Sequence, residues 1–144
     1  MIRILIVDDS DTIRLILKEL LNGDPEIEVV GEAVNGLEAI DMTRRLKPDL
    51  ITMDVAMPVM DGLEATRRIM TENPTPIIVV TAKSNFQEMN VAFEAMEAGA
   101  LDVLAKPQGF GFEPPTWETE FLQMVKSLAN VKPRATTQET HDDR

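Results

Sequence analysis

Five short runs of β-branched and other apolar residues alternate with helix-like segments along this chain, and this alternation constrains its fold most strongly. The runs cover residues 2–7, 28–33, 50–53, 77–81 and 101–105. Their spacing of roughly 25 residues leaves room for one crossover helix between consecutive strands. The pattern therefore predicts an α/β fold on a parallel sheet, with helices covering both of its faces.

The segments between the runs carry apolar residues at the 3.6-residue period of an amphipathic helix. The predicted faces are formed by Ile13, Ile16, Leu17 and Leu20, by Leu37 and Ile40, by Leu63, Thr66 and Ile69, by Phe86, Met89, Phe93 and Met96, and by Trp117, Phe121, Met124, Val125 and Leu128. An amphipathic helix needs such a stripe to stay folded, so we interpret these residues as core. The length of 144 residues fits one domain with one core.

Right-handed crossover connections leave few topologies for five consecutive strand–helix units. The compact choice is a flavodoxin-like, doubly wound five-stranded parallel sheet of order 2-1-3-4-5 with five helices. In that order the first and third strands are neighbours, and ligands bind outside their carboxyl ends, where the winding of the chain reverses. The functional site is therefore predicted at that edge of the sheet.

Acidic residues stand at this predicted edge. Asp8 and Asp9 follow the first apolar run directly, and Asp54 follows the third. Three carboxylates brought together in this way repel one another and lose solvation, which is costly without a cation. A divalent metal ion, with an anion to share it, would remove that cost. Because Thr81 ends the fourth run and Lys106 follows the fifth, the pattern predicts a site for phosphate chemistry.

The composition excludes several classes of function. The chain has 14 Lys and Arg against 25 Asp and Glu, a formal net charge of -11 that repels nucleic acid and anionic membranes. It has no cysteine, which excludes disulfides, thiol catalysis and Cys-ligated zinc. The apolar run at the amino terminus is too short for a signal peptide, and no later stretch approaches the about 20 residues of a membrane span. We expect a cytoplasmic protein.

The polar residues in this order resemble the receiver domain of two-component response regulators. The resemblance covers residues 1–130 and is carried by Asp8 with Asp9, by Asp54 followed by Met57, Pro58, Met60, Asp61 and Gly62, by Thr81 with Ala82, and by Lys106 with Pro107. More narrowly, residues 57–62, 74–76 and 99–102 are similar to the receiver of chemotaxis-type protein-glutamate methylesterases. Residues 131–144 are polar and are expected to form a disordered tail or linker remnant, in which His141 has no role.

The resemblance implies that Asp54 is the phosphoacceptor, whose carboxylate attacks a phosphohistidine on a sensor histidine kinase. It also implies that Asp8, Asp9 and Asp54 hold Mg²⁺ together with the backbone carbonyl of Ala56. The implied function is two-component phosphorelay signalling, with a role in chemotaxis, in which phosphorylation switches a surface that binds a downstream output protein or domain. The chain is expected to be a monomer or a phosphorylation-dependent dimer, without direct contact to nucleic acid or membrane.

Two further residues would bind the phosphoryl group in such a receiver. Lys106 would pair with it as a point charge, and the Thr81 hydroxyl would donate a hydrogen bond to it. The resemblance also implies a cis peptide bond before Pro107. The sequence departs from the family at Val103, where receivers commonly place Tyr or Phe as a rotameric switch. Lys83, at the rim of the predicted crevice, is expected to influence the access of water or a phosphodonor.

Methylesterase activity is excluded for this chain, because it has no Gly-x-Ser-x-Gly elbow and no triad histidine in a folded segment. Whether the chain is an excised receiver or a natural stand-alone protein stays open. A phosphatase of the haloacid dehalogenase type is a rival, but it would need a second Asp two positions after Asp54, where Ala56 stands. A degenerate receiver that only binds proteins is the other rival, and the intact Asp54, Thr81 and Lys106 argue against it.

Overall fold

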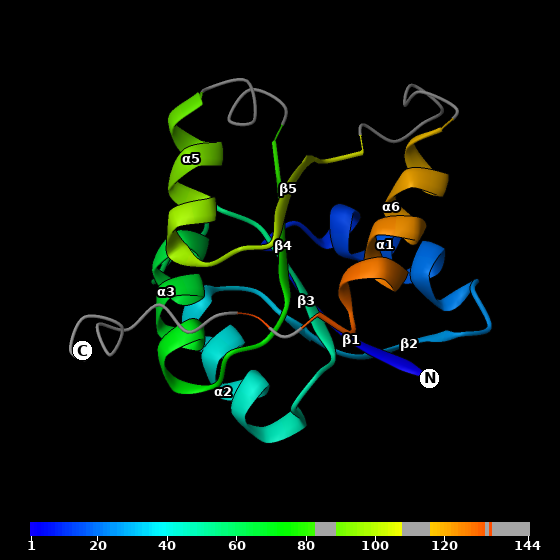
Figure 1. Ribbon diagram of the computed structural model, residues 1–144, viewed down its shortest axis with the longest axis horizontal. Helices are drawn as coiled ribbons and strands as arrows, with labels where there is room; N and C mark the ends of the chain where they lie inside the picture. Colours follow the sequence, from blue (N-terminus) through cyan, green and yellow to red (C-terminus); the bar gives the residue numbers. More distant parts are fainter. Residues whose placement is uncertain (83–88, 108–115, 132, 134–144) are drawn as a thin grey trace.

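The computed structural model describes residues 1–82, 89–107, 116–131 and 133. Its strands are β1 (Ile2–Val7), β2 (Ile27–Ala33), β3 (Leu50–Met53), β4 (Ile77–Thr81) and β5 (Asp102–Ala105), and its described helices are α1 (Asp11–Asn22), α2 (Gly36–Leu46), α3 (Gly62–Glu72), α5 (Met89–Ala98) and α6 (Trp117–Leu128). Strands and helices alternate along the chain, as predicted (Figure 1). Among the described helices, none has the length and apolar character that a membrane span requires.

The five strands form one parallel sheet of order β2-β1-β3-β4-β5. This order confirms the predicted flavodoxin-like topology, in which β1 and β3 are neighbours. Two strand boundaries differ from the prediction by one residue. β2 already begins at Ile27, which pairs with Ile2, and β5 begins only at Asp102.

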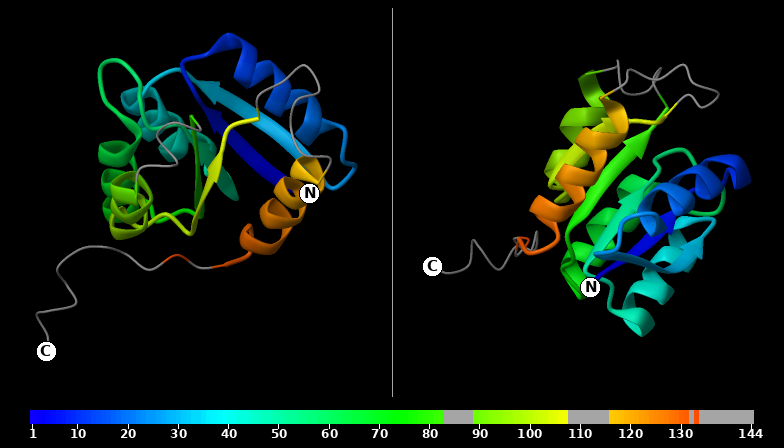
Figure 2. Two further views of the ribbon diagram at one scale, coloured as in Figure 1. Left: turned by 90° about the horizontal axis from the view of Figure 1, so that it is seen from above. Right: turned by 90° about the vertical axis from the view of Figure 1, so that its right-hand side faces the viewer.

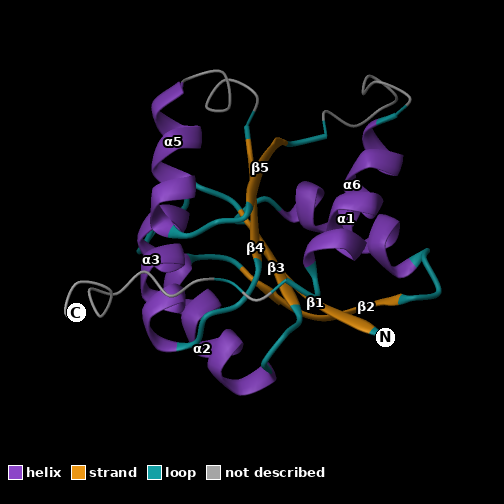
Figure 3. Ribbon diagram, in the orientation of Figure 1, coloured by secondary structure: helices purple, strands orange, loops and turns teal. Residues whose placement is uncertain are grey.

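Helices cover both faces of the sheet, with α1 and α6 on one face and α2, α3 and α5 on the other (Figure 2, Figure 3). Because side chains alternate across a strand, Ile4 and Ile6 of β1 pack with α1 and α6, whereas Leu5 and Val7 pack with the other helices. The inner strands are therefore buried on both faces. This explains why each of them is a nearly continuous apolar run in the sequence.

Helix α5 buries a different face from the one that its large residues predict. Phe93, at 63% exposure, and Met96 are exposed, whereas Ala95 is fully buried. Small side chains let α5 pack closely against its neighbours α3 and β5. Leu37 of α2, another residue that we assigned to the core, is also exposed. Phe86, assigned to the core for the same reason, lies outside the described residues.

Candidate functional site

The acidic residues lie where β1 and β3 end side by side. Val7 and Met53 are paired in the register of these strands, so the residues after them leave the sheet together. The Asp54 N–H donates to the Val7 carbonyl oxygen (2.9 Å), which extends the ladder by one bond. Carboxylate oxygens of Asp8, Asp9 and Asp54 all lie within 4.8 Å of one another. The structure therefore brings together the three carboxylates that we expected at this edge.

Burial makes this cluster electrostatically costly. Asp8 and Asp54 are 1% and 3% exposed, whereas Asp9 is open to solvent. Desolvation, together with the negative charge of Asp8, raises the pKa of Asp54 to about 6, although Lys106 acts in the opposite direction. Burial also raises the pKa of Asp8. Added positive charge would therefore favour the ionised form of both buried carboxylates.

Lys106 supplies one positive charge to the cluster. Its Nζ lies 3.1 Å from Asp8 Oδ2 and 3.2 Å from Asp54 Oδ2. Burial lowers the pKa of the Lys106 ammonium, but the charges of the two carboxylates outweigh burial and leave that pKa above its ordinary value. The ammonium is therefore charged at neutral pH and bridges the two buried carboxylates.

The other expected site residues occupy different positions around the cluster. Thr81 ends β4 in a buried position, and its carbonyl oxygen accepts a hydrogen bond from the Lys106 N–H (2.7 Å). Ala56 is exposed in the loop between β3 and α3. Val103 is half-buried in β5 and packs against the layer that contains α3 and α5. Lys83 lies outside the described residues.

The peptide bond before Pro107 is trans, so the expected cis bond is wrong. The trans form of an X–Pro bond is intrinsically favoured by about 0.5–1 kcal/mol, and a cis bond requires surroundings that overcome this preference. Lys106 reaches both Asp8 and Asp54 with the trans bond in place. The contacts of the ammonium therefore do not depend on a cis bond.

Two glycines hold the loop that follows Asp54. The Gly62 N–H donates to the Val55 carbonyl oxygen (2.8 Å), and a Cβ at Gly62 would lie only 1.7 Å from the Asp54 carbonyl oxygen. The Gly36 N–H donates to the Met60 carbonyl oxygen (2.9 Å), and a Cβ there would lie 2.7 Å from that oxygen. The loop is thus clamped between the N-termini of α2 and α3. Gly36 was not predicted as part of the site, although the Asn35-Gly36 dipeptide is a turn signal in the sequence.

Val59 lies in a strained turn of the same loop. Its φ of 72° falls in the left-handed region, which is unfavourable for a β-branched residue. The Met60 N–H donates to the Pro58 carbonyl oxygen (2.7 Å) across it, as in a γ-turn. Asn tolerates a positive φ better than Val does, so Val59→Asn should raise the free energy of unfolding by about 1 kcal/mol and the melting temperature by a few degrees.

Thermal unfolding of the two proteins measures this difference. Val131→Asn is the control, because Val131 is also exposed but lies outside the left-handed region, and it should give no gain. A melting temperature of Val59→Asn at or below that of the wild type would show that the turn stores no strain.

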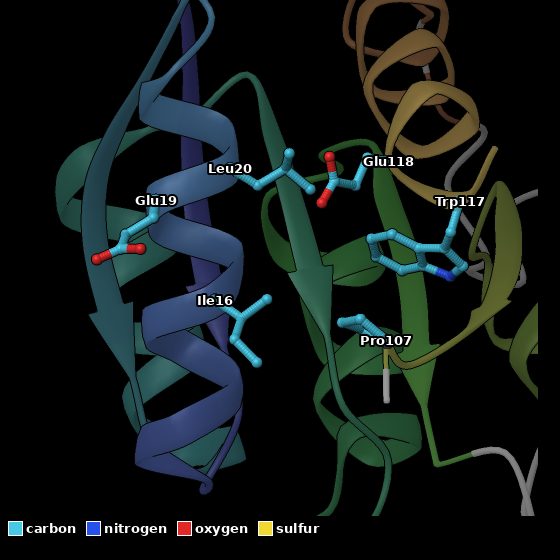
Figure 4. A pocket seen from close by; sticks show the side chains of 6 residues that line it. All are labelled: Ile16, Glu19, Leu20, Pro107, Trp117 and Glu118. Atoms are coloured by element: carbon cyan, nitrogen blue, oxygen red, sulfur yellow. The ribbon is translucent and has the colours of Figure 1, made fainter. Parts of the chain in front are cut away.

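A groove of about 310 Å³ lies between α1 and α6 (Figure 4). It is lined by Ile16, Glu19, Leu20, Pro107, Trp117 and Glu118. Figure 4 shows Ile16 and Leu20 facing Pro107 and Trp117 across it. Because Pro107 directly follows Lys106, this groove, with four apolar and two acidic residues in its lining, adjoins the site.

Comparison with known families and proteins agrees with this geometry. The response regulator receiver domain family matches residues 4–111. Protein-glutamate methylesterase/protein-glutamine glutaminase 4 of Geobacter metallireducens is 50% identical over 135 residues, which make up 92% of this chain and 38% of that protein. The corresponding protein 3 of Hahella chejuensis is 53% identical over 132 residues, with coverage of 90% and 37%.

Solved structures give the same answer for the fold. The response regulator domain of Thermotoga maritima CheB has a TM-score of 0.81 and 38% identity, over 92% of this chain and 99% of that one. A chain of the CheX-CheY-BeF₃-Mg²⁺ complex from Borrelia burgdorferi has a TM-score of 0.73 and 25% identity, over 88% and 87%.

The chain spans about 38% of the length of the curated relatives that it matches, and the solved CheB structure that it matches is a receiver domain. The matched part includes the strand ends that carry Asp8, Asp9, Asp54, Thr81 and Lys106. On the strand order, the acidic edge and these similarities together, the chain belongs to the response regulator receiver domain family and resembles the receivers of protein-glutamate methylesterases.

Proposed function

We propose that Asp54 accepts a phosphoryl group from a sensor histidine kinase in a Mg²⁺-dependent reaction, and that this reaction switches a protein-binding surface. One observation carries the proposal. The buried Asp54 carboxylate lies within 4.8 Å of two further carboxylates and 3.2 Å from the Lys106 ammonium. A nucleophile, a set of oxygen ligands for a cation and a phosphate-binding cation thus meet at one strand edge.

The donor set fits Mg²⁺. Hard divalent cations bind oxygen ligands, and the described cluster offers carboxylate oxygens from Asp8, Asp9 and Asp54. The carbonyl oxygen of Ala56 is the proposed fourth protein ligand. Mg²⁺, when bound, neutralises negative charge, so that an anionic phosphoryl group can approach an anionic carboxylate.

The chemistry of the chain's own residues follows from their contacts. Asp54 Oδ1 accepts a hydrogen bond from the Val55 N–H (2.8 Å), which fixes the orientation of the carboxylate. One Asp54 oxygen forms a bond to phosphorus while the bond from phosphorus to the kinase histidine nitrogen breaks, and that nitrogen takes a proton. Lys106 and the Thr81 hydroxyl would then hold the phosphoryl oxygens of the acyl phosphate.

The surface that responds is proposed to join α5, β5 and α6. Phe93 and Met96 of α5 are exposed, and Val103 of β5 is half-buried. Exposed apolar side chains of this size are suited to a protein partner. We place the receiver at residues 1–130 and a linker or tail at 131–144, of which Val131 and Pro133 are described.

The proposal extends to the signalling pathway in which the chain acts. The relatives named above are methylesterase/glutaminase proteins, and such a protein is the proposed output, in cytoplasmic chemotaxis-type signalling. The groove between α1 and α6 is the proposed contact surface for the kinase, because Pro107 in its lining directly follows Lys106 and because it offers both apolar and acidic side chains to a partner. The Borrelia burgdorferi CheX-CheY complex with BeF₃ and Mg²⁺ supports the assignment of a phosphate-type ligand and a cation to this fold.

Incubation with Mg²⁺ and acetyl phosphate, followed by intact-mass measurement, tests the proposed function. Wild type should gain one phosphoryl group that hydroxylamine removes, and EDTA should prevent the gain. Asp54→Ala should gain none, because it lacks the nucleophile. Labelling of Asp54→Ala to the wild-type extent would show that Asp54 is not the phosphoacceptor. A wild type that gains no phosphoryl group would contradict the proposed function and favour a domain that only binds proteins.

A further inference from the structure

Arg14, in the first part of α1, contacts the backbone of the acidic loop. Its side chain is only 13% exposed. Nη1 donates to the Asp8 carbonyl oxygen (2.7 Å), Nε donates to Glu32 Oε1 (3.2 Å), and Nη2 pairs with the Asp11 carboxylate. The guanidinium therefore ties the end of β1 to the end of β2 and to the start of α1.

We propose that Arg14 is a positioning residue that orients Asp8 and Asp9 for Mg²⁺ and thereby sets the affinity of the site. The inference rests on the proposed function, because it presupposes that these carboxylates bind the ion. The Asp8 carbonyl belongs to the planar peptide unit that leads into Asp9. Holding this oxygen therefore restricts the backbone rotation that would swing both carboxylates away from Asp54.

Asp9 depends on this restraint more than Asp8 does. Asp8 has further contacts, since its N–H donates to the Ala33 carbonyl oxygen (3.0 Å) and its Oδ1 accepts from the Ser10 N–H (2.8 Å). The Asp9 carboxylate has no hydrogen-bond or ion-pair partner within the part of the chain that the structure describes. Its direction is therefore set by the peptide unit on which Arg14 acts.

A purely electrostatic role for Arg14 predicts the opposite result. The guanidinium is a positive charge beside the cation site, so its removal alone should strengthen Mg²⁺ binding. A positioning role predicts weaker binding instead. Lys18 provides a matched control, because its Nζ pairs with the other oxygen of Glu32 (3.1 Å) from the same helix. Lys18 has no hydrogen bond to Asp8 among the described contacts.

The test is a Mg²⁺ titration of the intact chain without a phosphodonor. Trp117, the single tryptophan, reports by fluorescence, because its Nε1–H donates to the carbonyl oxygen of Ala105, the residue before Lys106. Arg14→Met should weaken the affinity for Mg²⁺ by about tenfold or more, because loss of a residue that holds a metal ligand in place typically has an effect of this size. Arg14→Lys, which keeps the charge but not the geometry, should weaken it as well, whereas Lys18→Met should leave it unchanged or tighter.

Melting temperatures in EDTA separate positioning from folding. Weaker Mg²⁺ binding by an Arg14 variant that melts as the wild type does supports the inference. If Arg14→Met fails to fold, Arg14→Lys decides. Equal or tighter binding by the folded Arg14 variants would overturn the positioning role while leaving the proposed function intact. Failure of the wild type to bind Mg²⁺ would instead overturn the proposed function, on which the inference rests.

Discussion

Gly62→Ala should destabilise the protein by at least about 3 kcal/mol, because the new methyl group has no room. A Cβ at Gly62 would lie 1.7 Å from the Asp54 carbonyl oxygen, which is backbone and cannot rotate away like the end of a side chain. Either α3 or the strand end that carries Asp54 must move. We therefore expect a large drop in the urea midpoint and loss of phosphorylation in the same variant.

Gly23→Ala is the matched control for this substitution. Gly23 follows α1 with a right-handed backbone (φ -72°), and a Cβ there would lie 3.3 Å from the Glu19 carbonyl oxygen. Its free energy of unfolding should change by less than about 1 kcal/mol. If Gly62→Ala unfolds at the same urea concentration as Gly23→Ala, the close approach to Asp54 does not constrain the fold.

Asp54→Asn should be more stable than the wild type at pH 7.5 in EDTA, by about 2–3 kcal/mol, although under the proposed function it should not accept a phosphoryl group. The pKa of Asp54 is raised from 3.8 to about 6, chiefly by desolvation, and one pH unit of such a difference corresponds to about 1.4 kcal/mol. Lys106 keeps its contact with Asp8 in the variant, so the ammonium is not left without a partner.

The sign of the pH dependence follows from this raised pKa. Below about pH 4 the carboxyl is protonated in both the folded and the unfolded chain, so it adds no instability. Between about pH 4 and 6 the unfolded chain loses its proton first, and the stability of the wild type falls as the pH rises. The advantage of Asp54→Asn should therefore be small at pH 4 and complete above pH 6.

Urea unfolding of both proteins in EDTA at pH 4 and pH 7.5 measures this change. Asp9→Asn is the control, because Asp9 is exposed and its replacement should shift stability by less than about 0.5 kcal/mol. Saturating Mg²⁺ should narrow the difference, since it stabilises the wild type by mass action. An Asp54→Asn variant less stable than the wild type at pH 7.5 would mean that local hydrogen bonds satisfy the Asp54 carboxylate.

The sequence was sufficient to predict the features that follow from the regular spacing of the apolar runs or from the position of a residue at the end of a strand. The five apolar runs and their spacing predicted the parallel sheet and its order, and the residues just after Val7 and Met53 predicted which carboxylates meet. The buried face of α5 was not predictable in this way. Phe93 and Met96 are larger and more apolar than Ala95, so hydrophobicity favours the side that the structure leaves exposed.

Side-chain contacts between distant parts of the chain were also not predictable from the sequence. Arg14 and Glu32 are 18 residues apart and meet because β1 and β2 are neighbours, which a one-dimensional pattern does not specify for single side chains. The approach of Gly36 to Met60 likewise depends on how α2 sits beside the loop after β3. The expected cis bond before Pro107 came from resemblance alone, and the structure has it trans.

The contact of the loop after Asp54 with the first residues of α2 and α3 has a consequence for the electrostatics of this acidic protein. At a helix start, the aligned peptide dipoles create a partial positive charge. In this fold α1, α2 and α3 all begin at the edge where β1, β2 and β3 end. The helix dipoles thus place partial positive charge along one edge of a chain whose formal net charge is -11. Because these dipoles belong to the backbone, substitutions of surface charges elsewhere leave this partial positive charge in place.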